Sequence, residues 1–258
     1  MAIIDADAHV VESEKTWSYM AGADAQHRPQ TVILSGPNGK DRELWALDGR
    51  LMVKGPISVD EMTRAEREME DLTGRLRHMD ELGTDIQVLY PTVFLSPVTT
   101  KPAVEAALYR SYNRWLADVH AQTGDRMRWA VMLPFMSPEI ALEELRFGLD
   151  NGACGVFMRG IEVERQPSDP YFYPIYAAAE EANVPICLHA ATGSFTGAGF
   201  DAALSPRTMT TSDCRASPAF KLGTRICTPK SYQPWISAGR STPCTETITW
   251  PGSGPKPS

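Results

Sequence analysis

The chain has 258 residues, of which 43% are hydrophobic and 22% are charged, a balance typical of a globular protein with a sizeable buried core. Its formal net charge of -7 excludes the basic surplus that binding to nucleic acid or to an anionic membrane requires. We therefore expect a small-molecule substrate as the partner, with no nucleic acid and no membrane.

The amino terminus and the cysteines indicate the compartment. No basic stretch followed by an apolar run opens the chain, so we expect no secretory signal. The five cysteines are odd in number and lack C-x-x-C spacing, which disfavours both a disulfide framework and a zinc ribbon. These features predict a reducing, cytoplasmic location.

The first predicted strand covers residues 3–11 and ends in polar side chains, as a barrel strand does where it meets its active-site loop. Residues 12–59 follow as an insertion that we expect to be irregular and to lie over the barrel mouth. Within it, Asp48-Gly49 stands between two short apolar runs, a pattern that predicts a hairpin.

From residue 60 onward, helical and strand patterns alternate. The predicted helices cover 60–82, 102–122, 138–150 and 173–183, and the predicted strands 86–90, 129–133, 155–158 and 185–189. With the first strand, this makes five strands separated by four helices, which predicts parallel βα units with right-handed connections. We therefore expect an α/β fold of the (β/α)8 TIM-barrel type, incomplete at about five strands, over residues 1–204.

The character of the sequence changes in residues 205–258. Seven basic residues face two acidic ones there, eight prolines occur, and no apolar period survives. This composition predicts an irregular or disordered tail rather than three more barrel strands. It also suggests that the later part of the barrel was lost by truncation or by a frame shift.

Asp7 and His9 are two residues apart on the first strand, so their side chains point to the same face. His189 closes the fifth strand, and a barrel brings the ends of non-adjacent strands to one mouth. A carboxylate and two imidazoles suit zinc with an open position for water. The alternative for the Asp-x-His pair is a solvated strand end with an incidental histidine, but the three positions together favour a metal site.

Three stretches carry a resemblance to a known family: residues 4–9 (IDADAH), 77–92 (RHMDELGTDIQVLYPT) and 185–189 (PICLH). They resemble the amidohydrolase-related (amidohydrolase 2) group of the amidohydrolase superfamily, which includes aminocarboxymuconate semialdehyde decarboxylase and aromatic-acid decarboxylases. The resemblance covers about the first 200 residues.

The resemblance implies ligand roles for Asp7, His9 and His189, and its carboxylate-x-His variant is similar to the decarboxylase branch. It implies a divalent metal, with zinc as the first choice and manganese as the second. The implied function is decarboxylation or hydrolysis of a small carboxylated, aromatic-derived substrate. The family's later catalytic histidine and aspartate match nothing here, so the catalytic residues stay unassigned.

Three further residues at strand ends are candidates for substrate binding. Arg159 follows a strand and offers two parallel hydrogen bonds to a substrate carboxylate, although a surface salt bridge with Glu162 or Glu164 explains it equally well. Tyr90 and Thr92 end the second barrel strand, where they line the pocket or serve packing.

Two functional hypotheses follow. The first is a metal-dependent hydrolase or carboxy-lyase. The second is a catalytically inactive fragment of such an enzyme that lacks the last ligand strand. Because five of eight barrel strands leave two open edges, we expect this chain to be poorly soluble or to form homo-oligomers.

Overall fold

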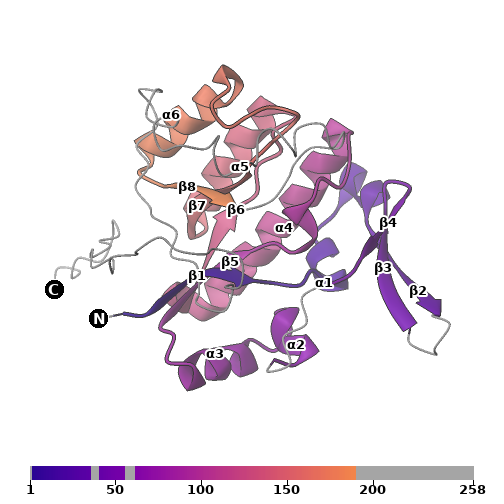
Figure 1. Ribbon diagram of the computed structural model, residues 1–258, viewed down its shortest axis with the longest axis vertical. Helices are drawn as coiled ribbons and strands as arrows, with labels where there is room; N and C mark the ends of the chain where they lie inside the picture. The colour runs from indigo at the N-terminus through magenta and orange to yellow at the C-terminus, as the bar shows by residue number, and fades with distance from the viewer. Residues whose placement is uncertain (1, 36–40, 56–61, 190–258) are drawn as a thin grey trace, which may run out of the picture. The chain divides into compact units, whose positions relative to one another are not determined.

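The computed structural model describes residues 2–35, 41–55 and 62–189, and these form a five-stranded sheet with helices packed against it and a separate three-stranded sheet (Figure 1). The predicted tail at 205–258 and its boundary at residue 204 lie outside the described residues. None of the described helices is long and apolar enough to cross a membrane.

The larger sheet is parallel throughout and has the order β1-β5-β6-β7-β8. Its strands are β1 Ile4–His9, β5 Ile86–Tyr90, β6 Met127–Val131, β7 Ala153–Arg159 and β8 Ile186–His189. The sheet curls, with helices after its strands, so the predicted incomplete (β/α)8 barrel is confirmed (Figure 1).

The interior strands are apolar because both of their faces are covered. All seven residues of β7 are buried, from Ala153 to Arg159, and four of the five in β5 are buried as well. Parallel strands enclosed in this way read as continuous apolar runs rather than as alternating ones. The core therefore lies between the curled sheet and its helices.

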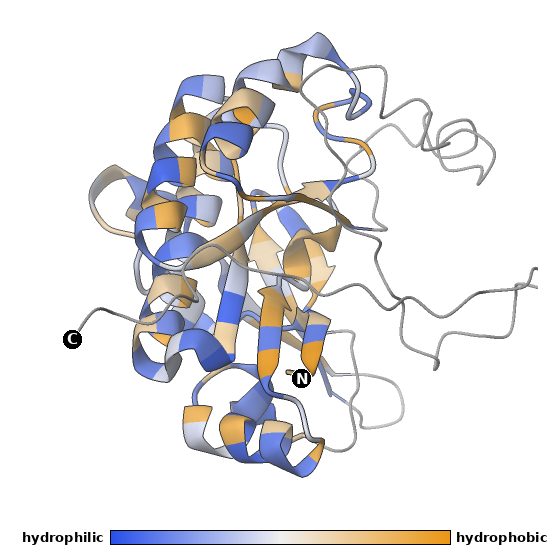
Figure 2. Cartoon of the chain, turned by 90° about the vertical axis from the view of Figure 1, so that its left-hand side faces the viewer, coloured by the Kyte–Doolittle hydropathy of each residue, from blue (hydrophilic) through white to orange (hydrophobic). Residues whose placement is uncertain are grey.

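The helices that follow the strands begin and end at sequence signals. They are α3 Leu72–Glu81, α4 Pro102–Thr123, α5 Pro138–Asp150 and α6 Tyr173–Glu181. A proline stands in the first turn of the last three, where its missing N–H costs nothing. Gly83 and Gly152 follow α3 and α5 with φ of 69° and 85°, the left-handed conformation that ends helices. Hydrophilic and hydrophobic residues alternate along these helices, as one buried and one solvated face require (Figure 2).

The single helix predicted over 60–82 is wrong in one respect, because the structure has two helices there. A short helix, α2 Arg64–Arg67, precedes α3, and Met69 between them has a φ of 56°. Each helix has its own cap: Thr63 and Glu66 form a capping box for α2, and Asp71 accepts a bond from Gly74 N at the start of α3.

The insertion after β1 is more regular than its sequence suggests. It contains α1 Glu14–Trp17, the 3-10 turn η1 Gly22–His27, and an antiparallel sheet of β2 Gln30–Ser35, β3 Asp41–Leu47 and β4 Arg50–Val53. The predicted hairpin is confirmed, with Asp48 and Gly49 at φ of 46° and 76° between β3 and β4. Strand β2 was not foreseen.

Buried aromatic residues join the insertion to the loop after β5. Trp17 is fully buried, and its ring centre lies 5.7 Å from that of Trp45 in β3 and 6.0 Å from that of Phe94. Phe94 belongs to the 3-10 turn η2 Val93–Leu95, which directly follows the end of β5. The insertion is thereby anchored beside the C-terminal end of β5, and its covering of the barrel mouth stays a prediction.

Candidate metal centre

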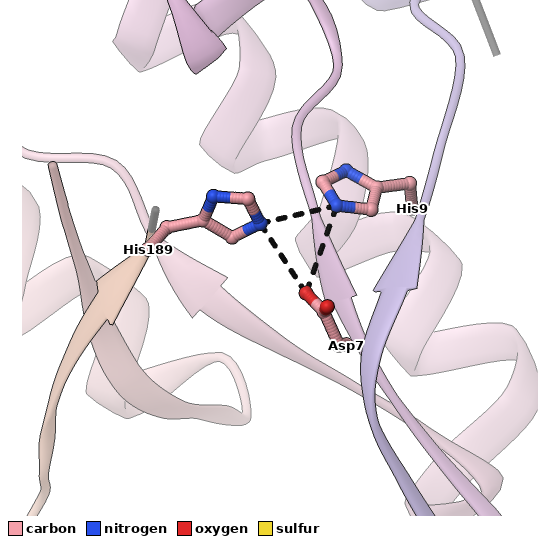
Figure 3. Close-up of side chains that lie close together, drawn as sticks. All are labelled: Asp7, His9 and His189. Carbon is pink, nitrogen blue, oxygen red and sulfur yellow. Dashed lines mark hydrogen bonds and ion pairs between the residues drawn. The ribbon is translucent and has the colours of Figure 1, made fainter. Parts of the chain in front are cut away.

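The side chains of Asp7, His9 and His189 converge between the two outermost strands of the described sheet (Figure 3). His9 Nε2 lies 3.2 Å from His189 Nε2. Asp7 Oδ1 lies 3.3 Å from His189 Nε2 and 3.7 Å from His9 Nε2. One atom of each side chain therefore faces a common point.

The spacing of these atoms fits a small divalent ion. Ligands about 2.0–2.1 Å from zinc at tetrahedral angles stand about 3.3 Å from one another. The three distances between Asp7, His9 and His189 span 3.2 to 3.7 Å, close to the edges of such a tetrahedron. The donor set of two imidazole nitrogens and one carboxylate oxygen also suits zinc. Geometry and chemistry both fit a metal ion.

Strand topology brings the three residues together. The carboxyl ends of parallel strands share one edge of a sheet, and β1 and β8 both end there in a histidine. The pairing of β1 with β5 shifts register between Asp5 and Ala8, so Asp7 departs from the regular pleat. Curling of the sheet then places the end of β8 opposite the end of β1.

A backbone contact fixes the orientation of the His9 ring. Its Nδ1 lies 2.9 Å from Pro91 O. A carbonyl oxygen only accepts, so Nδ1 carries a proton, and in the neutral ring Nε2 presents a lone pair to Asp7 and His189. Histidine ligands of metals commonly donate their second ring N–H to a carbonyl in this way. Among the described residues, His189 Nδ1 is buried without a hydrogen-bond partner.

Asp7 is ionised in this setting. Burial alone would raise the pKa of its carboxyl group, but contacts with His189 and His9 outweigh burial and hold the pKa below its usual range. The carboxylate is the form that a metal ion requires.

Aromatic rings stand beside the three residues. The ring centres of Tyr90 and Phe157 each lie 5.9 Å from that of His189, and 6.2 Å from each other. Burial, with Cys187 nearby, raises the pKa of Tyr90 far above its usual value, so the phenol keeps its proton. Tyr90 lies next to the candidate ligands, and its contact with a substrate stays a prediction.

Thr92 is buried, and its polar groups are engaged with the protein. The hydroxyl donates to Val10 O at 2.6 Å, and the backbone N–H donates to Glu12 Oε1 at 3.0 Å. Thr92 thus joins the ends of β1 and β5. A role in substrate binding stays a prediction for this residue as well.

Arg159 lies 3% exposed, with its guanidinium paired to Glu162: Nε to Oε1 at 2.9 Å and Nη2 to Oε2 at 2.5 Å. Its remaining contacts are Phe94 O at 3.1 Å and the Tyr109 hydroxyl at 3.3 Å. Of the two alternatives weighed for Arg159, the structure contains the pair with Glu162, buried rather than at the surface.

Arg159 also lines a cavity of about 310 Å³ with Glu105, Tyr109 and Glu164. A substrate contact by Arg159 stays a prediction that would use this cavity. None of the three candidate metal ligands lines it.

Two buried carboxylates were not singled out from the sequence: Glu12 and Glu105 are 1% and 2% exposed. Each accepts a backbone N–H in the structure. Only Glu12 had a usable signal, because it follows His9 by three residues in a loop after a barrel strand, where functional residues concentrate.

A family model described as amidohydrolase matches residues 4–220. Among solved structures, an amidohydrolase from Mycobacterium avium subsp. paratuberculosis K-10 superposes with a TM-score of 0.59 at 20% identity. A 4-oxalomesaconate hydratase from Rhodopseudomonas palustris and a 5-carboxyvanillate decarboxylase from Novosphingobium aromaticivorans each give 0.51, at 20% and 19% identity.

These structures share the fold with the chain over most of its length but are longer than it. The matches cover 78%, 85% and 80% of this chain and 62%, 59% and 56% of the three solved chains, in the same order. The chain therefore spans less than two thirds of each of these proteins. The decarboxylase structure contains bound manganese and 3-methoxy-4-hydroxy-5-nitrobenzoic acid.

Proposed function

The chain belongs to the amidohydrolase family, and from this premise we propose that Asp7, His9 and His189 bind a divalent metal ion that serves decarboxylation or hydrolysis of a small carboxylated substrate. The observation that carries the proposal is the convergence of the three ligand atoms within 4.8 Å of one another. The family is metal-dependent, and the solved structures that resemble the chain include a decarboxylase and a hydratase.

We propose zinc as the first choice of metal, since two imidazoles and one carboxylate are a common zinc donor set. Manganese is the second choice, because the related 5-carboxyvanillate decarboxylase binds it. When bound, the ion would supply Lewis-acid chemistry, either polarising a substrate oxygen or lowering the pKa of a water.

The residues of this chain would bind and orient the substrate around that ion. Tyr90 and Phe157 present aromatic surface beside His189, which favours a flat, aromatic-derived substrate. The carboxylate of Asp7 offsets part of the charge of the ion, so a substrate carboxylate meets a site that is still cationic. We propose an aromatic-derived carboxylic acid as the substrate class.

Metal analysis of the full chain tests the site. We expect about one zinc or manganese ion per chain after dialysis against the metal, and less than about one tenth of that in Asp7→Ala/His9→Ala, since two of three ligands are gone. His78→Ala is the matched control, because His78 lies on α3 away from the cluster and should leave the content unchanged. Equal metal content in the double variant and the parent would refute the proposed site.

Activity separates the two reactions from the inactive alternative. The metal-loaded chain is incubated with hydroxylated benzoic acids while CO2 release is followed, and with amide and lactone analogues while hydrolysis is followed. CO2 release supports decarboxylation. A chain that binds metal but catalyses neither reaction is the inactive metal-binding fragment.

A further inference from the structure

Glu12 follows the candidate ligand His9 by three residues, and its carboxylate has an unusual setting. The residue is 1% exposed, and among the described residues no lysine or arginine forms an ion pair with it. Instead, Oε1 accepts the backbone N–H of Thr92 and Oε2 accepts that of Val93, both at 3.0 Å. Both carboxylate oxygens are thus used to hold two consecutive backbone amides of the loop after β5.

That loop also holds His9. The carbonyl that accepts the His9 Nδ1 proton belongs to Pro91, the residue immediately before the first amide bound by Glu12. Two other bonds tie the same strand ends together, from the Thr92 hydroxyl to Val10 O at 2.6 Å and from Val10 N to Tyr90 O at 3.0 Å. The position of the Pro91 carbonyl therefore depends on bonds that flank it.

Burying the Glu12 carboxylate in this way costs folding free energy, which suggests a role for it beyond stability. A buried carboxylate without a cation has lost its hydration, and two backbone hydrogen bonds return only part of that free energy. A neutral side chain in the same space would cost less. Glu12 does, however, offer two acceptors to two adjacent N–H groups, which neither an apolar side chain nor a glutamine can do.

We propose that Glu12 is a positioning residue of the metal site: by fixing the loop at residues 91–93, it holds the Pro91 carbonyl where it fixes the tautomer and direction of His9. The proposal rests on the proposed metal site, and it adds to that site a residue that touches neither metal nor substrate. Outer residues that orient a histidine ligand typically change metal affinity by about 10- to 100-fold when they are altered.

Glu12→Gln in the full chain is the direct test. The amide keeps the volume but turns one acceptor into a donor that faces a backbone N–H. We expect the dissociation constant for Zn²⁺, measured by competition with a chromophoric chelator, to rise about 10- to 100-fold. A change of less than about twofold would overturn the proposal.

Glu105→Gln is the matched control. Glu105 is also buried and accepts a backbone N–H, from Met136 at 2.9 Å, but it lies on α4 and contacts neither strand end. Both substitutions replace a buried carboxyl group by an amide of the same volume, but only that of Glu12 should weaken metal binding. An equal loss of affinity in both variants would refute the proposal, because the effect would then belong to any buried carboxyl group that is replaced.

The tautomer of His9 in the metal-free chain gives a readout that needs no metal. Nitrogen-15 NMR of the imidazole should show Nδ1–H in the parent and in Glu105→Gln, and a mixture of tautomers in Glu12→Gln. If Glu12→Gln does not fold, Glu12→Asp is measured in the same two ways, and we expect a smaller change in the same direction. If the parent binds no Zn²⁺ but Glu12→Gln still changes the tautomer of His9, the metal site is refuted and the effect of Glu12 on His9 stands. If Glu12→Gln leaves the tautomer unchanged, the positioning role is refuted.

Discussion

Two clusters of charged or ionisable side chains lie at the C-terminal ends of strands in the five-stranded sheet. They differ in whether hydrogen-bond donors and acceptors are present in equal measure. At the end of β7, the guanidinium of Arg159 finds acceptors in Glu162, Phe94 O and the Tyr109 hydroxyl. At the ends of β1 and β8, Asp7 Oδ1 and His9 Nε2 both face His189 Nε2, which can donate to only one of them at a time. A matched cluster stabilises the fold, whereas an excess of acceptors is the arrangement that the proposed metal ion would balance.

Breaking the matched cluster should have the largest effect on stability. Arg159→Leu leaves the Glu162 carboxylate buried and unpaired, which typically costs about 3–5 kcal/mol. Urea denaturation at neutral pH measures this loss, and the metal content of the folded fraction should not change. A loss below about 1 kcal/mol would contradict the distinction between the two clusters.

Glu105 lies beside the pair of Arg159 and Glu162 but has no salt bridge of its own among the described residues. The pH dependence of stability should therefore show the cost of a buried carboxylate that lacks a cation. Burial raises the pKa of Glu105 to about 7, against the hydrogen bond from Met136 N, which lowers it. A raised folded-state pKa adds stability below the unfolded value near 4.5, and this contribution disappears as pH rises to about 7. We expect Glu105→Gln to remove up to about 3 kcal/mol of the decline between pH 5 and pH 8.

Urea titrations of the parent and of Glu105→Gln at both pH values measure that difference. Glu12, whose pKa burial likewise raises to about 7, remains in both proteins, so the variant should keep part of the decline. Parallel pH profiles for the two proteins would show that Glu105 does not titrate differently in the folded state.

An exposed ion pair should give the smallest effect. Asp80 accepts from Arg126 Nη2 at 2.6 Å, but the two side chains are 65% and 39% exposed. Asp80→Ala should change the free energy of unfolding by less than about 1 kcal/mol, since water screens the pair and Arg126 keeps its bond to Asp85 O. A larger loss would mean that burial is not what separates the strong pair from the weak one.

The sequence predicted the βα units well because apolar spacing alone defines them. The predicted helix at 138–150 has the same bounds as α5, since a proline opens it and Asn151-Gly152 closes it. The break at Met69 could not be foreseen, because a left-handed methionine depends on the caps around it rather than on its own preference. Strand β2 escaped because its apolar residues Ile33 and Leu34 are largely exposed and its pairing with β3 is a tertiary choice.

In the candidate site, too, the features set by local sequence could be predicted, and those set by tertiary contacts could not. Asp7, His9 and His189 could be grouped from sequence because each lies at a strand end and parallel strands share an edge. The burial of Glu12 could not, since it follows from two backbone amides some eighty residues away. For Arg159, sequence spacing suggested Glu162 or Glu164 as a partner but could not say that the pair is enclosed by Phe94 and Tyr109.

The strand order has a consequence for folding during translation. Each strand after β1 in the β1-β5-β6-β7-β8 sheet pairs with one already synthesised, so the sheet can grow in the order of translation. The ligand set, by contrast, joins His9 to a residue made 180 positions later. At the proposed site, metal capture would therefore be a late event, and nascent chains of increasing length should acquire the metal only after β8 has left the exit tunnel.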